Sequence, residues 1–164
     1  MSVAGTLEMK LTVNETLPGN APASAASKKV VTHDQWNLTQ TFPVDPSLPC
    51  TEVVSVEATL VAGALTLDLT ALTATNGATR SMNGLKLQML FARPDPANAN
   101  PIIIKTGATN GYAFKGAAWS DEIKPGQASL YFGNEQAPDV GASAKNIDLT
   151  GTGSQKLRLE MVFG

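Results

Sequence analysis

Alternation of apolar and polar residues, interrupted by turn-forming residues, constrains the fold of this 164-residue chain more than any other feature. Residues 84 to 132 contain four apolar segments, with a cluster of proline, glycine or asparagine in each gap. A period of two is the repeat of a half-buried β-strand, and Asn-Gly and Pro-Gly pairs favour tight turns. This stretch therefore predicts the core of an all-β protein.

The same alternation continues in the first part of the chain. It covers residues 3 to 13, 30 to 42 and 53 to 62. In the segment 30 to 42, the residues that are expected to share one face are Val30, Thr32, Trp36, Leu38 and Phe42. After Gly63 the apolar parity changes to Leu65, Leu67 and Leu69. Because one extra residue exchanges the two faces of a strand, we predict a bulge or tight turn at Gly63.

Later strands are expected to turn one parity toward the core. The expected inward residues are Leu85, Leu87, Met89 and Phe91, then Ala128, Leu130 and Phe132, and finally Leu157, Leu159, Met161 and Phe163. Phe163 is still in pattern, which indicates that the C-terminal residues belong to the sheet.

The pattern as a whole predicts a single-domain, jelly-roll-like antiparallel β-sandwich that spans residues 1 to 164. We count about eight to ten strands and no amphipathic helix. Two facing sheets cover both apolar faces, and long loops at 14–29, 42–50 and 133–144 suit connections that cross between sheets. The order of the strands is not readable from the pattern.

Residues 14 to 29 form the longest stretch without apolar periodicity, with two prolines, a glycine and many small residues. We expect an extended arm or long loop here. A loop of this length in a compact domain indicates contact with a partner or a neighbouring subunit. The alternative is a loop that lies free on the surface.

Composition excludes several classes of partner. Charged residues make up 16% of the chain, against roughly 25% in an average soluble domain. The net charge is −2 and no basic stripe is present, so we expect no direct binding to nucleic acid. No apolar run has the length of a membrane span and none resembles a secretory leader, so we expect no membrane association. A weakly charged surface suits a protein that packs against neighbours.

No catalytic constellation is visible, and we predict a protein that is not an enzyme. His33 is the only histidine, and its neighbour Asp34 points to the opposite face of a strand. Cys50 is the only cysteine and follows a proline in a loop, which favours a structural thiol. The carboxylates lie in separate segments, and neither a calcium loop nor a phosphate loop is present. We therefore predict no catalytic, cofactor-binding or metal-binding residues and no cofactor.

Three aromatic residues raise a different possibility. Trp36, Tyr112 and Trp119 are candidates for a platform on which a sugar ring stacks. The alternative, which we favour, is that their rings pack in the core or in a subunit interface.

The second half of the chain carries, in order, NANPIII, TNGY, EIKPGQASLYF, PDVGASAK and NIDLTGTGSQKLRLEMVFG. It resembles small β-sandwich structural proteins of tailed bacteriophages that occur beside the major capsid protein, as head decoration (cement) or head-fibre proteins. Residues that match the strand and turn signatures of that group are Ile123, Pro125, Gly126, Leu130, Thr152, Gly153 and Ser154.

The resemblance implies a virion protein that is synthesised in the host cytoplasm and sits on the outer capsid surface, commonly as a homotrimer. Its partner is the major capsid protein, whose shell it stabilises by bridging capsomers. We expect the arm at 14–29, helped by the first strand, to make intersubunit or shell contacts. The candidate partner-binding residues are Leu17, Pro18, Pro22, Trp36, Phe42 and Trp119. The alternative is a carbohydrate-binding β-sandwich or a fibre or tail adhesin.

Overall fold

The computed structural model describes residues 5–16, 30–42, 50–132 and 136–164, and these contain strands and no helix. The chain divides into two compact units. One unit is Ala4–Phe42, and the other combines Met1–Val3 with Pro43–Gly164. The sequence pattern predicts one domain over residues 1–164, and this stays a prediction.

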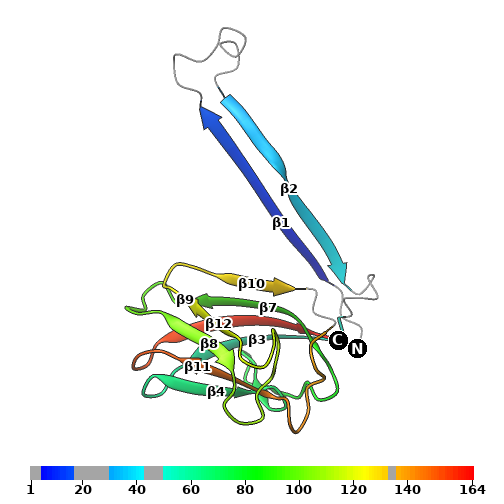
Figure 1. The fold of residues 1–164 in the computed structure, drawn as a ribbon, viewed down its shortest axis with the longest axis vertical. Coiled ribbons are helices and arrows are strands. Elements are labelled where there is room, and N and C mark those ends of the chain that lie inside the picture. The colour runs from blue at the N-terminus through cyan, green and yellow to red at the C-terminus, as the bar shows by residue number, and fades with distance from the viewer. Residues whose placement is uncertain (1–4, 17–29, 43–49, 133–135) are drawn as a thin grey trace. The chain divides into compact units, whose positions relative to one another are not determined.

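The larger unit is built from two four-stranded antiparallel sheets (Figure 1). The first sheet has the order β10-β7-β12-β3, and the second has the order β4-β11-β8-β9. A short ribbon of β5 and β6 lies between β4 and β7 in the sequence. The strand bounds are β3 (Glu52–Thr59), β4 (Ala64–Asp68), β5 (Leu72–Thr73), β6 (Thr79–Arg80), β7 (Leu87–Pro94), β8 (Ile102–Thr106), β9 (Ser120–Ile123), β10 (Ser129–Phe132), β11 (Asn146–Thr150) and β12 (Lys156–Phe163).

The pairing of these strands is that of a jelly roll. The pairs β3 with β12, β4 with β11, β7 with β10 and β8 with β9 make one long folded-back ribbon. The pairs β7 with β12 and β8 with β11 then close the two sheets. The predicted jelly-roll-like β-sandwich is therefore confirmed. The described residues contain twelve strands, more than the eight to ten expected, because the count also includes β5, β6 and the two strands of the smaller unit.

The core fills the space between the two sheets. Several predicted inward faces are confirmed, since Val54, Val56 and Ala58 of β3 are buried. On the last strand every expected inward residue is at most 1% exposed: Leu157, Leu159, Met161 and Phe163. The opposite sheet contributes buried residues from each of its strands, namely Leu67, Ile102, Ile104, Ile123, Ile147 and Leu149. The prediction that Phe163 ties the chain end into a sheet is confirmed.

The predicted inward face of β7 is wrong beyond Leu87. Leu90 and Ala92 are buried, whereas Met89 and Phe91 lie half-buried on the outer face. The register against β12 shifts between Val162 and Phe163, so that one extra residue, Gln88, is inserted in β7. Such a bulge exchanges the faces of a strand, and this one is not signalled by glycine or proline.

The predicted face of β10 is also wrong. Tyr131, not Leu130, packs against the core, and its ring lies 5.9 Å from that of Phe114 in an edge-to-face arrangement. The Tyr131 hydroxyl donates to a carboxylate oxygen of Asp121 at 2.6 Å. A tyrosine can therefore face inward at this edge strand because its polar end has a partner.

Gly63 forms a tight turn, as predicted. Ala62 and Gly63 have φ angles of 52° and 85°, and they lie between the bridged residues Val61 and Ala64. Two consecutive positive φ angles are the mark of a type I′ turn. A Cβ atom on Gly63 would lie 2.7 Å from the carbonyl oxygen of Gly151. The turn passes the chain from β3 in one sheet to β4 in the other.

Candidate interaction surface

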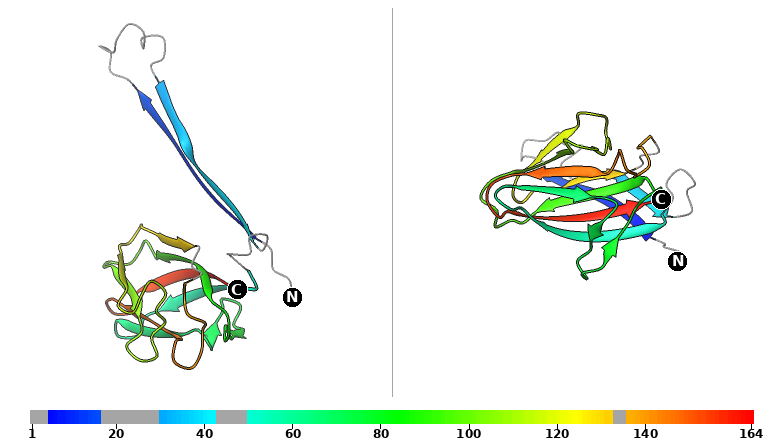
Figure 2. Two further views of the ribbon diagram at one scale, coloured as in Figure 1. Left: turned by 45° about the vertical axis from the view of Figure 1, so that its right-hand side comes forward. Right: turned by 90° about the horizontal axis from the view of Figure 1, so that it is seen from below.

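The smaller unit is a long antiparallel hairpin of β1 (Gly5–Thr16) and β2 (Val30–Phe42). The two strands run side by side in Figure 1 and in the left view of Figure 2. Asn14, Glu15 and Thr16 belong to β1, so the expected loop at 14–29 is wrong for these three residues. They continue the ladder because β2 supplies partners for them. Residues 17–29 lie outside the described part of the chain.

A β-bulge divides β2. Leu11 lies opposite Trp36 and Val13 lies opposite His33, so Asp34 and Gln35 together face the single residue Thr12. The bulge exchanges the two faces of β2 along its length. The shared face predicted for Val30, Thr32, Trp36, Leu38 and Phe42 is therefore wrong for Val30 and Thr32, which lie opposite Thr16 and Asn14.

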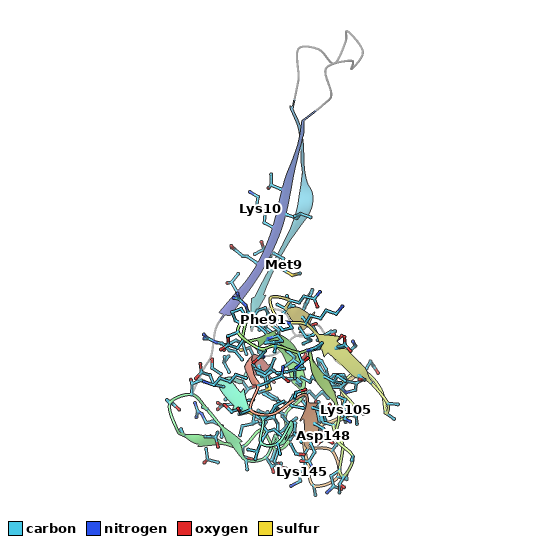
Figure 3. All side chains as sticks on the ribbon, turned by 90° about the vertical axis from the view of Figure 1, so that its left-hand side faces the viewer. Met9, Lys10, Phe91, Lys105, Lys145 and Asp148 are labelled. Atoms are coloured by element: carbon cyan, nitrogen blue, oxygen red, sulfur yellow. The ribbon has the colours of Figure 1, made fainter. Side chains whose placement is uncertain are left out.

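The register gives the hairpin one apolar face. We define the apolar face by its apolar register positions, which are Leu7, Met9, Leu11 and Val13 in β1 and Val31, Trp36, Leu38 and Phe42 in β2. We define the polar face by the alternate positions, which include Thr6, Glu8, Lys10, Thr12, Asn37, Thr39 and Thr41. Figure 3 shows the neighbours Met9 and Lys10 leaving the ribbon on opposite sides.

Two side chains of the apolar face are described, and one of them is largely open to solvent. Leu11 is 55% exposed and Met9 is half-buried. Thr6, Glu8, Lys10, Thr12 and Thr39 on the polar face are exposed, as expected for their type. An isolated two-stranded hairpin is marginally stable in water, and exposed apolar faces mark interaction surfaces. The apolar face is therefore the strongest candidate interaction surface.

The outer surfaces of the jelly roll differ from each other. On the β4-β11-β8-β9 sheet, Asp148 accepts hydrogen bonds from the Thr66 hydroxyl at 2.7 Å and from the backbone N–H of Ala108 at 2.9 Å. Lys105 lies opposite Asp148 on this polar surface (Figure 3). On the other sheet, Phe91 lies opposite Leu130, and both are half-buried. That outer surface is more apolar.

A shallow groove of about 470 Å³ is lined by residues of β3, β7 and β12 in the first sheet. Its charged lining residues are Glu57, Arg93, Asp95, Lys156 and Arg158. Arg158 stands between Glu57 and Arg93 in register, and its Nε atom lies 2.8 Å from a carboxylate oxygen of Glu160. The lining mixes both signs of charge and does not select one class of ligand.

The described side chains with reactive chemistry have structural surroundings. Cys50 is buried, which raises the pKa of its thiol and disfavours the reactive thiolate. Burial alone would raise the pKa of Asp68, but hydrogen bonds from Lys145 and Thr70 and the charge of Lys145 outweigh it and lower the pKa. Within the described ranges no three His, Cys, Asp or Glu residues come together as metal ligands. The side chain of His33 is outside the described part.

The proposed aromatic platform is not formed by the two rings that are described. Tyr112 is fully buried and Trp119 is 7% exposed, so their rings pack in the core, as favoured. The Tyr112 hydroxyl donates to the Pro138 carbonyl at 2.8 Å and accepts from the Leu87 N–H at 3.0 Å. Burial raises the pKa of Tyr112 to about 12. The Trp119 indole N–H donates to the Tyr112 carbonyl at 3.2 Å.

The residues expected to bind partners separate into three groups. Leu17, Pro18 and Pro22 lie outside the described residues. Trp36 and Phe42 occupy register positions on the apolar face of the hairpin. Trp119 is 7% exposed and packs in the core of the jelly roll. Sequence reasoning did not name Leu11 and Met9 as candidate residues, although their alternation was the available signal.

Comparison with family models, with curated proteins and with solved structures returned no match. The described residues also contain no helix of the length and apolarity needed to cross a membrane.

Proposed function

We propose that this chain is a non-enzymatic structural protein of a bacteriophage virion, a decoration (cement) protein that binds the shell of the major capsid protein. It sits on the outer capsid surface and stabilises the shell by bridging capsomers. The observation that carries the proposal is the hairpin, a unit of its own on which Leu11 is 55% exposed, while the jelly roll has its own closed core.

The jelly roll supports this proposal as a rigid platform. Its core closes between two sheets, and Phe163 at the chain end is fully buried. A protein that clamps neighbouring capsomers needs a body that does not deform and a separate element that reaches a neighbour. The hairpin supplies that element, because strands and exposed apolar faces are common means of attachment between proteins.

A carbohydrate-binding function has less support. Sugar-binding sandwiches present aromatic rings to solvent, whereas Tyr112 and Trp119 are in the core of this protein. No observation among the described residues favours a sugar site, so we do not propose one.

The test is binding of the full chain to empty capsid shells. The chain is mixed with shells assembled from the major capsid protein of a phage that encodes it, and the shells are sedimented. We expect saturable binding at a fixed ratio to capsomers, and a higher temperature of shell disruption when the sites are full. No co-sedimentation at micromolar concentration would overturn the proposal.

A truncated chain tests the attachment element. Removal of residues 1 to 27 deletes β1 and the segment that follows it, and we expect shell occupancy to fall by at least about tenfold, the effect of losing about 1.4 kcal/mol of binding free energy. Unchanged occupancy would show that the jelly roll alone attaches. Two measurements on the same protein test the sugar alternative. One is binding to a glycan array, and the other is tryptophan fluorescence during titration with a sugar.

A further inference from the structure

We propose that the open edge of β3 binds an extended segment of another protein, which adds to the sheet as a further strand. The segment carries apolar side chains at alternate positions and a lysine or arginine that pairs with Glu57. The proposal concerns the jelly roll alone. It goes beyond the proposed function, because it needs neither the hairpin nor a capsid shell.

The first argument is the direction of the backbone groups at this edge. β3 is the outer strand of its sheet and is paired there with β12. Directly after β3, the Leu60 N–H donates to the Gln155 carbonyl at 2.9 Å, in continuation of the ladder between β3 and β12. Residues in an antiparallel pair turn their backbone groups alternately toward and away from the partner strand, so those of Glu57 and Thr59 point away from β12. No described residue bonds to the N–H and C=O groups of these two residues.

The chain itself already adds one residue to this edge. The Thr75 N–H donates to the Ser55 carbonyl at 2.9 Å. Ser55 has the same outward backbone orientation, since it lies two residues before Glu57 in the ladder. The edge therefore accepts a backbone donor from outside its sheet. Residues 57 to 59 stay open, between the bond from Thr75 and the turn that follows β3.

The second argument is a groove of about 480 Å³ that includes the open edge. It is lined by residues 56–59 of β3, residues 65–68 of β4 and most of the segment 71–77. Its lining contains the buried apolar residues Val56, Ala58, Leu67 and Leu72. Side chains of an added strand alternate between two faces, so every second one lies on the side of Val56 and Ala58, in this groove. The groove therefore selects apolar residues at alternate positions.

The third argument is charge. The charged residues that line the groove are both acidic, Glu57 and Asp68. Asp68 already has a cation, since Nζ of Lys145 lies 2.5 Å from its carboxylate. Glu57 is exposed and makes no ion pair among the described residues. Arg158 stands opposite Glu57 in register, but its guanidinium pairs with Glu160. A cation on the outer face of the added strand would complement Glu57.

The same features disfavour a second copy of this chain as the occupant. Thr75 covers the edge at Ser55, so the β3 strand of another rigid sandwich would meet the segment 71–77 before it paired along its length. Two such edges would also bring one Glu57 close to another, and like charges across a strand pair are destabilising. A flexible segment of another protein meets neither obstacle.

The test uses a short fluorescein-labelled peptide in which three valines alternate with threonines and terminal lysines. The full chain is titrated into the peptide, and binding is followed by fluorescence anisotropy. A control peptide of the same sequence carries N-methyl groups on its central backbone amides, which removes the donors and leaves the side chains in place. We expect saturable binding of the first peptide with a Kd below about 500 µM, and at least about tenfold weaker binding of the control.

Three variants of the chain locate the site. Thr59→Pro removes an outward N–H and keeps the bonds to β12, and we expect at least about tenfold weaker binding. Glu57→Lys reverses the charge beside the added strand and should weaken binding at least about fivefold. Glu122→Lys is the matched control, because it makes the same change at an exposed position of β9, at the edge of the other sheet remote from β4. Binding should change less than about twofold there.

Four results would overturn the proposal. They are no saturable binding at chain concentrations up to about 1 mM, equal binding of the N-methylated peptide, an equal loss in Glu122→Lys, and unchanged binding in both Thr59→Pro and Glu57→Lys. Circular dichroism checks that each variant is folded. Glu57→Lys alters an exposed side chain, so it keeps the test decisive if Thr59→Pro does not fold.

Two further measurements separate this proposal from its rivals. Light scattering gives the mass of the chain, and a dimer that is lost in Thr59→Pro would assign the edge to a second copy instead. Sedimentation with capsid shells is carried out independently of the peptide titration. Loss of shell binding would leave the peptide result standing, and loss of peptide binding would leave the shell result standing.

Discussion

The hairpin and the jelly roll use the same sequence pattern with opposite results. In β12 the alternating Leu157, Leu159 and Met161 are buried between two sheets. In β1 the alternating Met9 and Leu11 are half-buried and 55% exposed, respectively. Alternation therefore predicts that a strand has an apolar face, but not which layer covers it. The jelly roll covers its inward faces within one chain, whereas Leu11 of the hairpin is largely exposed.

A tight turn and a buried tyrosine hydroxyl help to close the core of the jelly roll. The described part of the hairpin has no counterpart of either feature. A tight turn at Ala62 and Gly63 sends the chain from one sheet to the other. The buried Tyr112 hydroxyl then joins β7 to the segment that contains Pro138. A single substitution can remove either feature. The expected changes in the free energy of unfolding decrease from the core to the surface.

The largest effect is expected from equal truncations in the two units. Leu90→Ala empties a fully buried position in β7 and should lower the free energy of unfolding by about 2–5 kcal/mol. Leu11→Ala removes a side chain that is 55% exposed and should change the unfolding of the jelly roll by less than about 0.5 kcal/mol. Urea unfolding is followed by Trp119 fluorescence in a Trp36→Phe background. Equal effects would mean that both units share one cooperative core.

The turn at Gly63 should be sensitive to a single methyl group. Gly63→Ala adds a Cβ atom 2.7 Å from the Gly151 carbonyl oxygen at a φ of 85°, and should cost about 1–3 kcal/mol. The neighbouring Ala62→Gly relieves a positive φ of 52° and should be neutral or stabilising by up to about 1 kcal/mol. Thermal unfolding of both variants measures this difference. Similar melting temperatures would show that this turn does not determine the stability of the sandwich.

Tyr112→Phe should cost about 1–3 kcal/mol, because it leaves the Leu87 N–H and the Pro138 carbonyl without their partner in the core. Burial raises the pKa of Tyr112 to about 12 from an ordinary value of 10. The unfolded chain then loses this proton before the folded protein does, so stability should fall as pH rises from about 10 to 12.

This pH dependence should be absent in Tyr112→Phe. Urea unfolding at a series of alkaline pH values measures it, and the 295 nm absorbance difference between wild type and variant locates the titration of Tyr112. Tyr131→Phe is the control for the loss of a half-buried hydroxyl. A Tyr112 titration near pH 10 would show that its hydroxyl is open to water.

The smallest effect is expected from the ion pair of Lys145 and Asp68, whose atoms lie 2.5 Å apart near the surface. Lys145→Met should cost about 0.2–1 kcal/mol at neutral pH. The pKa of Asp68 is lowered from 3.8, so the contribution is present above that pH and lost as pH falls through the folded value.

Denaturant unfolding at pH 7 and pH 3 measures this change. Lys105→Met is the control, because Lys105 lies on the same sheet and makes no ion pair among the described residues. A cost above about 2 kcal/mol would mean that the pair is buried.

Much of the fold could be predicted from local pattern. Strong alternation at Leu157, Leu159, Met161 and Phe163 predicted both the strand and its buried face. The parity change at Gly63 predicted the turn, because glycine marks positive φ. The bulges at Gln88 and at Asp34 were not predictable, since a bulge depends on the partner strand and these residues carry no local signal.

The candidate surface was predicted in part. Trp36 and Phe42 were expected to contact a partner, and the register places them on the apolar face together with Leu11. Trp119 was expected to do the same but packs in the core, because the segment between β8 and β9 folds over the sandwich and its indole N–H bonds to Tyr112. An aromatic residue in a loop has no period from which its burial can be read.

The sequence by itself determined the all-β class, the sandwich and the inward faces of its most regular strands, because side chains in a strand alternate with a fixed period. Tertiary structure alone decided the order of the strands, since the pairs β3 with β12 and β4 with β11 join residues far apart in the chain. It also decided that β1 and β2 form a unit of their own. Hydrogen bonds between backbones are alike in every pairing, so only the burial of whole faces selects one arrangement.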